Sequence, residues 1–257
     1  MSSRYLSVAG GLAERLLRTL VASPGLLLPP MLMPVFFFIA FAGGLSAISN
    51  APGFDYAAGY TSFEFIFVLT QAAAFGGVFT GFSVAADFQS GFGRRLLLAT
   101  PHRSALLLGY GLVALVRAAI TFAVLTVIGV LAGMTISGSP LELLGLYGLA
   151  FIVNMAGTLF AAGVALRFRS LQATPLMQVP VFLFLFLAPV YVPRELLTGW
   201  VHTVSAFDPA TAVMESGRDL LAGQPADFLQ ALGIAAGMVA VLVVFAMRGL
   251  RKAEAAG

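Results

Sequence analysis

The sequence predicts an all-helical membrane protein that crosses the bilayer six times. Of its 257 residues, 60% are hydrophobic and only 10% are charged, and the mean hydropathy is +0.98. Soluble domains carry about 25% charged residues. Six apolar runs, each close to the roughly 20 residues needed to cross the hydrocarbon core, are separated by polar connections. We therefore expect a multi-pass protein of a cell membrane and a single domain over residues 1–257.

The reactive side chains are too few for several classes of function. The chain has no cysteine, so it has no disulfide, no thiolate nucleophile and no thiolate metal site. Its one lysine, Lys252, lies between Arg251 and Ala253, so the chain lacks a phosphate-binding loop of the G-x-x-x-x-G-K-[ST] type. His102 and His202 are expected on opposite sides of the bilayer. We therefore expect no catalytic residue, no metal site and no cofactor on this chain.

The predicted elements follow one another along the chain. In residues 1–22 the apolar residues are spaced so that they fall roughly on one side of a helix, with charged residues between them. This pattern predicts an amphipathic helix at the membrane surface rather than a cleavable signal peptide. Prolines 29, 30 and 34 predict a kinked entry to the first span. The stretch 192–227 is too polar to span and too hydrophobic for a loose loop, so it predicts two short re-entrant helices at the outer face. The spans themselves are predicted at residues 26–48, 61–86, 105–133, 141–166, 172–191 and 228–247.

The charges predict the orientation in the membrane. Eleven of the 14 Lys and Arg residues fall in segments on the same side as the N-terminus, whereas seven of the 11 acidic residues fall on the other side. Basic residues are enriched in cytoplasmic connections. Both termini are therefore expected in the cytoplasm.

The densest charge between two spans lies in the stretch 87–104, on the predicted cytoplasmic side. Asp87 ends the second span, Gly91 permits a sharp turn, and the sequence RRLLLA predicts a short helix along the membrane surface that Pro101 ends. One interpretation is a docking segment for another protein. The alternative is that Arg94, Arg95 and Arg103 only set the topology by reaching anionic headgroups.

Several polar residues lie within the predicted spans. Glu64 contacts either a cationic substrate or partner, or simply lies at the outer interface. Arg117 is expected at the inner interface or in an ion pair with Asp87. Small residues four apart, such as Gly77 and Gly81 or Gly233 and Gly237, serve either folding or a dimer interface. Candidate residues lining a translocation path, with satisfaction of neighbouring helices as the alternative, are Glu64, Thr70, Gln71, Asn154 and Thr158.

Three segments resemble the permease subunits of ABC-2 type ABC transporters, especially those of the daunorubicin-resistance type and related lipo-oligosaccharide exporters. The family pattern D-x-x-x-G-x-x-x-x-L-L-x-T-P-x-x-R, followed by G-x-x-L-A-x-L-x-R, is similar to the sequence from Asp87 to Arg117. The pattern V-P-x-x-x-L-P-x-W resembles YVPRELLTGW, and N-P-x-T followed by R-x-L-x-x-G resembles DPATAVMESGRDLLAG. These segments occur in the family's order and cover most of the chain.

The resemblance implies roles for particular residues. The cytoplasmic segment would be a coupling helix inserted into a separate ATPase subunit, which would bind the ATP and Mg²⁺. Arg94 and Arg95 stand where the family often has a glutamate, so a complementary acidic partner surface is expected. The residues implied to couple to the ATPase are Asp87, Gly91, Arg94, Arg95, Leu96, Leu97, Thr100, Pro101 and Arg103. For the outer segment the alternatives are an exit gate and ordinary interfacial anchoring, with Pro193, Glu195, Leu197 and Trp200 as the candidate gate residues.

The leading hypothesis is a permease subunit of an ATP-driven exporter of hydrophobic or amphipathic drug-like molecules. Its expected partners are an ABC ATPase, a second permease that is either an identical chain or a paralogue, and the lipid of a bacterial cell membrane, with no nucleic acid. The alternatives are an exporter of lipid or lipid-linked glycan and a non-catalytic membrane scaffold or channel. No paired carboxylates or convergent histidines support a membrane-embedded enzyme.

Overall fold

The computed structural model describes residues 2–23, 25, 28–100 and 102–255, and no strand occurs among them. The prediction of an all-helical chain is confirmed. The α-helices are α1 Ser2–Ala22, α2 Leu28–Phe38, α3 Gly59–Gln89, α4 Phe92–Ala99, α5 Ser104–Leu131, α6 Pro140–Phe168, α7 Thr174–Leu187, α8 Gly199–Ser205, α9 Pro209–Ala222 and α10 Phe228–Ala255.

Four helices in the described part of the chain are long and apolar enough to cross a membrane: α3, α5, α6 and α10. The first and fifth predicted spans correspond to shorter apolar helices, Leu28–Gly43 and Leu171–Leu187. In the first, α2 contains Pro34, passes into a π-helix at Ile39–Gly43 and is followed by a 3₁₀-helix at Ser46–Asn50. Proline removes one main-chain donor from the helix and sterically blocks the preceding turn. From Leu28 on, the span expected over 26–48 with a kinked entry consists of three short helical segments.

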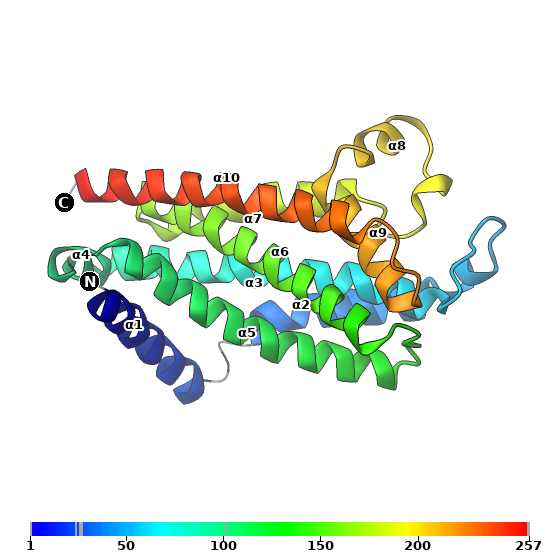
Figure 1. Cartoon of the computed structure of the whole chain (residues 1–257), viewed down its shortest axis with the longest axis horizontal. Helices are drawn as coiled ribbons and strands as arrows, with labels where there is room; N and C mark the ends of the chain where they lie inside the picture. Colours follow the sequence, from blue (N-terminus) through cyan, green and yellow to red (C-terminus); the bar gives the residue numbers. More distant parts are fainter. Residues whose placement is uncertain (1, 24, 26–27, 101, 256–257) are drawn as a thin grey trace.

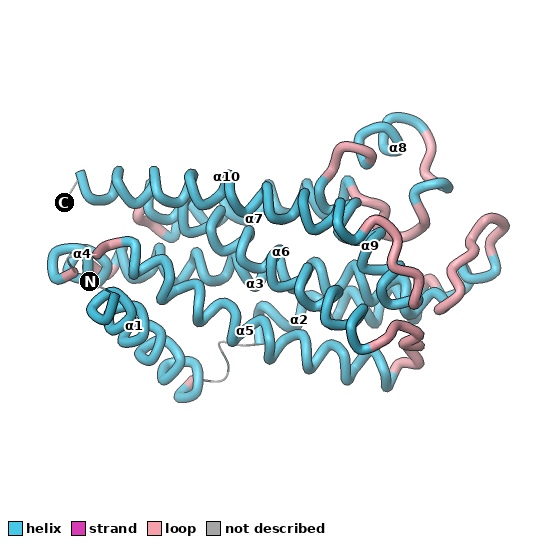
Figure 2. The backbone as a smooth tube through the Cα atoms, in the orientation of Figure 1, coloured by secondary structure: helices cyan, strands magenta, loops and turns pink. Residues whose placement is uncertain are grey.

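The bundle has two distinct ends (Figure 1). The start of α1, the helix α4 and the end of α10 lie together at one end, which we call the α4 end. Helices α8 and α9 and the connection before α3 lie at the opposite end, which we call the α8 end. Figure 2 shows that most of the longer non-helical connections are also at the α8 end, where α8 projects away from the bundle.

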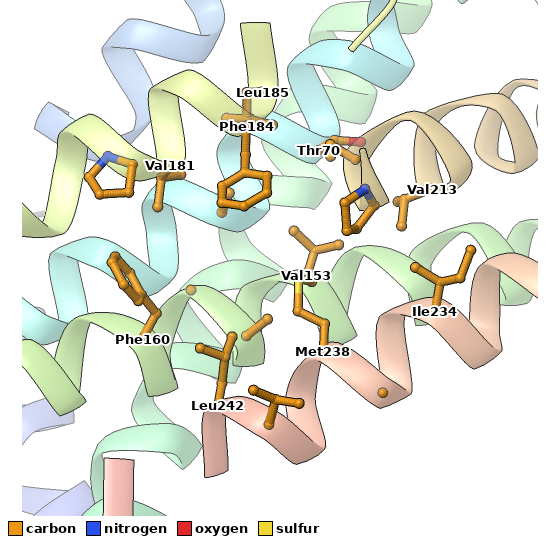
Figure 3. Close-up of a pocket in the computed structure, with 18 residues that line it drawn as sticks. Thr70, Val153, Phe160, Val181, Phe184, Leu185, Val213, Ile234, Met238 and Leu242 are labelled. Carbon is orange, nitrogen blue, oxygen red and sulfur yellow. The ribbon is translucent and has the colours of Figure 1, made fainter. Parts of the chain in front are cut away.

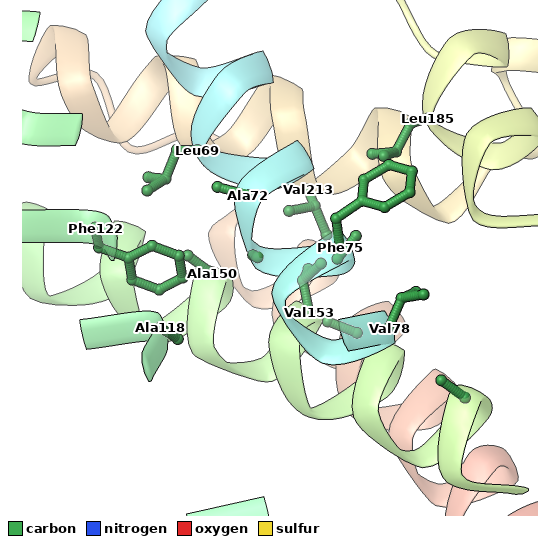
Figure 4. Packing of buried hydrophobic residues seen from close by; sticks show 14 of the residues in the cluster. Leu69, Ala72, Phe75, Val78, Ala118, Phe122, Ala150, Val153, Leu185 and Val213 are labelled. Carbon is green, nitrogen blue, oxygen red and sulfur yellow. The ribbon is translucent and has the colours of Figure 1, made fainter. Parts of the chain in front are cut away.

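Helix α3 is the centre of the bundle. The most apolar stretch of α3 is 89% buried within the chain, whereas that of α10 is only 11% buried. Figure 4 shows Leu69, Ala72, Phe75 and Val78 of α3 among buried side chains from the surrounding helices. Polar side chains on α3 are therefore shielded by protein, while α10 presents most of its apolar surface outward.

Glycines bring α3 and α6 into close contact. A Cβ added at Gly77 would collide with the main chain of α6 at Thr158, and one added at Gly81 would collide with Ala161. A Cβ at Gly157 would in turn lie 2.5 Å from the carbonyl oxygen of Ala74. Gly77 and Gly81 thus serve packing within the chain, whereas Gly233 and Gly237 of α10 face open space.

Candidate functional site

A buried carboxylate joins three helices at the α4 end. Asp87, near the end of α3, accepts hydrogen bonds from both terminal nitrogens of Arg15 in α1, at 3.1 and 3.2 Å. It also accepts one from the Tyr110 hydroxyl of α5 at 2.6 Å. Bidentate pairs of this kind are strong and geometrically specific. Asp87 therefore holds α1, α3 and α5 together at one point, which we call the Asp87 junction.

The Asp87 junction also fixes the start of α4. The guanidinium of Arg15 lies 3.8 Å from the centre of the Phe92 ring, in the first turn of α4. Gly91 precedes this helix with a φ of +76°, a conformation that favours glycine. A Cβ on Gly93 would lie 2.6 Å from the Phe88 ring. The turn between α3 and α4 thus depends on glycines, as the sequence predicted for Gly91.

Helix α4 has two unlike faces. Gly93 and Leu97 are buried against the bundle and Leu96 is half-buried. Arg94, Arg95 and Leu98 are exposed, Leu98 to 71%. The helix therefore anchors itself by one face and presents two cations and a leucine on the other.

The remaining residues of the predicted coupling segment lie around α4. Thr100 is buried, and Arg103 forms an ion pair with Glu254 of α10 at 3.4 Å. Gln89 accepts a hydrogen bond from the main-chain N–H of Leu171, just before α7, at 2.8 Å. Pro101 lies outside the described residues. The segment around α4 is thus bonded to the end of α10 and to the residues just before α7.

A buried arginine connects several segments at the α8 end. Arg218 of α9 donates to the main-chain carbonyls of Phe63, Pro189 and Val190, at 3.4, 2.8 and 3.3 Å. Its guanidinium lies 3.4 Å from the centre of the Phe63 ring, and burial lowers the pKa of Arg218 to about 10. Tyr56 donates to the Arg218 carbonyl at 2.7 Å. Arg218 therefore ties α9 to the start of α3 and to the residues that follow α7.

Two polar side chains of α3 are buried with unsatisfied atoms. Glu64 and Gln71 are both 0% exposed, and among the described residues none of their side-chain oxygen and nitrogen atoms forms a hydrogen bond of normal geometry. They are seven positions apart, about two helical turns, so they share one face of the helix. Phe67 lies between them on that face. The centre of its ring lies 6.3 Å from that of Phe37 in α2 and 5.7 Å from that of Phe186 in α7. This polar face of α3 is therefore covered mainly by aromatic rings.

The other candidate path residues are occupied by contacts with helices. Thr70 donates to the carbonyl of Ile66 and Thr158 to that of Asn154. Asn154 of α6 donates to the Ala73 carbonyl of α3 at 2.9 Å, leaving its side-chain oxygen without a partner. The structure therefore brings Glu64 and Gln71 together on one face but does not bring these three residues to it.

The candidate gate residues are exposed to different degrees. Pro193 and Leu197 are half-buried, Glu195 is exposed and Trp200 is 67% exposed on the projecting helix α8. Leu196, between them, packs against the loop at Gly53, where a Cβ would lie 2.8 Å away. This outer segment rests on the connection before α3 rather than on the centre of the bundle.

Of the two placements expected for Arg117, the ion pair with Asp87 is excluded, and several residues were missed. Asp87 pairs with Arg15 and Tyr110 and not with Arg117, which lies two helical turns beyond Tyr110 in α5 and is buried. Arg15, Tyr110 and the exposed Leu98 were not predicted as site residues. Arg218 was matched only as part of a motif. An amphipathic pattern in the RRLLLA stretch was the one signal that could have indicated Leu98.

Comparison with known proteins identifies the family of the chain. Residues 11–222 match the family described as ABC-2 type transporter. The chain belongs to this family. A curated relative of this ABC-2 chain, the daunorubicin resistance ABC transporter permease protein DrrB1 of Streptomyces coeruleorubidus, is 25% identical over 238 residues. That alignment covers 90% of this chain and 82% of the relative.

The family assignment gives the Asp87 junction a context. ABC-2 chains are membrane transport components, and their ATPase activity lies on a separate subunit. The ABC-2 family, the apolar helices and the resistance-permease relative together support an exporter membrane subunit.

Proposed function

We propose that this chain is the permease subunit of an ATP-driven exporter, and that the exposed face of α4 docks into its ABC ATPase. The observation that carries this proposal is the anchoring of α4. Its Leu97 face is packed into the bundle, its start is held by the Asp87 junction, and its opposite face presents Arg94, Arg95 and Leu98. Movement of a docked ATPase would be transmitted directly to α1, α3 and α5. ATP and Mg²⁺ would be bound by the partner.

Six membrane crossings are the arrangement that best fits the contacts. Helix α1 packs against the start of α5, where Gly109 faces the Ala9 carbonyl, and α3 begins at the other end, where Ser62 bonds to Thr135. These contacts support a crossing by the intervening α2 segment. Likewise α6 ends near Gln89, at the α4 end, while Gly145 near its start lies beside Phe228, where α10 begins. These contacts support a crossing by the α7 segment, and the excess of basic residues supports a cytoplasmic α4 end with both termini.

The translocation path is proposed along the face of α3 that carries Glu64 and Gln71. The covering helix α2 changes to a π-helix at Ile39–Gly43, a feature frequent at functional sites, and the covering helix α7 contains Pro180. The aromatic rings between them suit hydrophobic or amphipathic drug-like cargo. A second permease, packed against the apolar surface of this chain, would complete the path.

Docking can be tested by cysteine crosslinking, because the chain has no native cysteine. We expect Leu98→Cys to crosslink to the ABC ATPase that is expressed with it. Leu97→Cys, on the buried face of α4, and Leu141→Cys, exposed to 77% at the start of α6, are the controls and should not crosslink. Equal crosslinking at Leu98 and Leu141 would contradict the proposed docking surface.

The proposed path has a separate test. In vesicles containing the permease and ATPase, ATP should drive transport of the hydrophobic dye rhodamine 6G, and Glu64→Gln should change its rate. Asp55→Asn removes the same charge from an exposed position in the connection before α3 and should leave the rate unchanged. A Glu64→Gln variant that transports at the normal rate would remove Glu64 from the path without affecting the docking proposal.

A further inference from the structure

An apolar cavity of about 420 Å³ lies between α7 and α10, and neither Glu64 nor Gln71 of α3 belongs to its lining. Figure 3 shows its walls: Val181 and Phe184 come from α7, Phe160 from α6, and Met238 and Leu242 from α10. Helix α9 covers one end through Val213. At the mouth, Phe184 is 54% exposed and Val241 is 69% exposed. The cavity therefore opens sideways, between two apolar helices.

The chemistry of the walls limits what can occupy the cavity. Among the described residues that line the cavity, only Thr70 carries a side-chain hydroxyl, and it already donates to the Ile66 carbonyl at 2.8 Å. Burying a polar group here without a hydrogen-bond partner would be unfavourable. Sites for drug-sized molecules generally contain a few placed polar groups that fix the orientation of the ligand. None of the described side chains in the lining has an unused hydrogen-bond donor, so the cavity suits a plain hydrocarbon chain rather than a drug-like molecule.

The position of the cavity identifies the source of such a chain. Helix α10 is long and apolar enough to span a membrane and only 11% of its apolar stretch is buried within the protein, so wherever a second permease does not cover it, this helix would meet the acyl chains of the bilayer. Gly237 widens the cavity on the α10 side, since a Cβ there would meet no atom within 4 Å. We propose that the cavity binds one acyl chain of a bilayer phospholipid, which enters between α7 and α10 while its headgroup stays at the membrane surface.

Two glycines of α10 allow a matched test of this lipid site. Gly233 and Gly237 are one turn apart and both face open space, but only Gly237 lines the cavity. Gly237→Leu should fill the cavity, whereas Gly233→Leu adds the same side chain outside it. Leucine favours helix more than glycine does, so neither change should disrupt α10. Val241→Trp, at the exposed mouth, is a second variant that narrows the entrance.

The full-length chain would be placed in nanodiscs that contain phosphatidylethanolamine with a photoactivatable diazirine on one acyl chain, and the labelled residues mapped by mass spectrometry. We expect labelling of cavity residues such as Met238 and Phe160 in the unmodified chain and in Gly233→Leu. Gly237→Leu and Val241→Trp should reduce it at least fivefold, with labelling of the outward Val244 unchanged.

Three results would overturn the proposal. The first is unchanged cavity labelling in Gly237→Leu and Val241→Trp. The second is an equal decrease in Gly233→Leu, and the third is displacement of the lipid label by rhodamine 6G, which would assign the cavity to cargo. None of these depends on ATPase docking or transport, so the lipid site stands or falls separately from the proposed function.

Discussion

At the α4 end, the buried charge of Asp87 is matched by side chains, the guanidinium of Arg15 and the hydroxyl of Tyr110. At the α8 end, the buried charge of Arg218 is matched by main-chain carbonyls, and the nearby carboxylate of Glu64 accepts no hydrogen bond of normal geometry in the described part of the chain. A side-chain pair can exchange partners when another protein binds. A guanidinium bonded to carbonyls of two segments can be released only if those segments move. The α4 end therefore suits the docking proposed for it, whereas the contacts at the α8 end hold α3, α9 and the residues that follow α7 in place.

The hydrogen bonds from Arg218 to main-chain carbonyls, which we call the Arg218 clamp, should have the largest effect on stability when they are removed. Arg218→Ala leaves three buried carbonyl oxygens without their donor and removes the contact with the Phe63 ring. Hydrogen bonds to charged groups contribute about 1.5–3 kcal/mol each, so we expect the free energy of unfolding to fall by about 3 kcal/mol or more. Unfolding in detergent would measure it, with the exposed Arg251→Ala as control. Equal losses in the two variants would contradict the clamp.

The side-chain junction should be less costly to remove. Asp87→Ala leaves the Tyr110 hydroxyl and Arg15 without their acceptor, and we expect a loss of about 2 kcal/mol in the free energy of unfolding. The Arg15 side chain is 43% exposed, so solvent weakens the ionic part of this contact. A double-mutant cycle with Arg15→Ala should give a coupling energy of about 1 kcal/mol. Additive losses would show that the two residues act independently.

The tyrosine should account for a smaller share of the same junction. Tyr110→Phe removes only the hydroxyl that donates to Asp87, and we expect a loss of about 1 kcal/mol, typical of one hydrogen bond. Tyr5→Phe in α1 is the control. If Tyr110→Phe were as damaging as Asp87→Ala, the contact with Arg15 would contribute nothing to the stability of the junction.

The smallest expected effect is a pH dependence confined to the α8 end. Burial raises the pKa of Asp208, which caps α9, to about 6. A raised pKa means that the folded chain binds the proton more tightly, so stability should rise as the pH falls from 7 through 6. Asp208→Asn keeps a side-chain oxygen for the cap and should reduce this rise, leaving the part contributed by Asp219, whose pKa burial also raises to about 6. Hydrogen exchange of α9 between pH 5 and 7.5 would measure it, and identical pH profiles in the two proteins would disprove the assignment.

The elements of this comparison were not equally predictable. Long apolar runs specify helices on their own, because a helix in a membrane must satisfy its main chain internally. The shorter Leu28–Gly43 and Leu171–Leu187 helices follow less directly from the sequence. How the chain bends at their prolines, and where it changes to a π-helix, depends on packing with other helices. The glycine turn at Gly91 was also predictable, because its cause is local.

The contacts of the buried charges were not predictable, because their partners are distant in the sequence. Arg15 and Asp87 are 72 residues apart, and Arg218 and Phe63 are 155 residues apart. The expected pairing of Arg117 with Asp87 assumed that both lie at the same depth, but Tyr110, two turns earlier in α5, is the residue level with Asp87. Which leucine of α4 is exposed likewise depends on how the helix rotates when Gly93 and Leu97 pack against the bundle.

The glycine contact between α3 and α6 has a mechanical consequence. Because Gly77, Gly81 and Gly157 place main chain directly against main chain, neither helix can slide or rotate past the other without a collision. We expect α3 and α6 to tilt as one stiff body in any working cycle. Helices α2 and α7, which are short and contain proline, are then the parts of the bundle that can bend. Force applied at α4 would be borne by the stiff pair, and the change of shape would occur in the two helices that flank it.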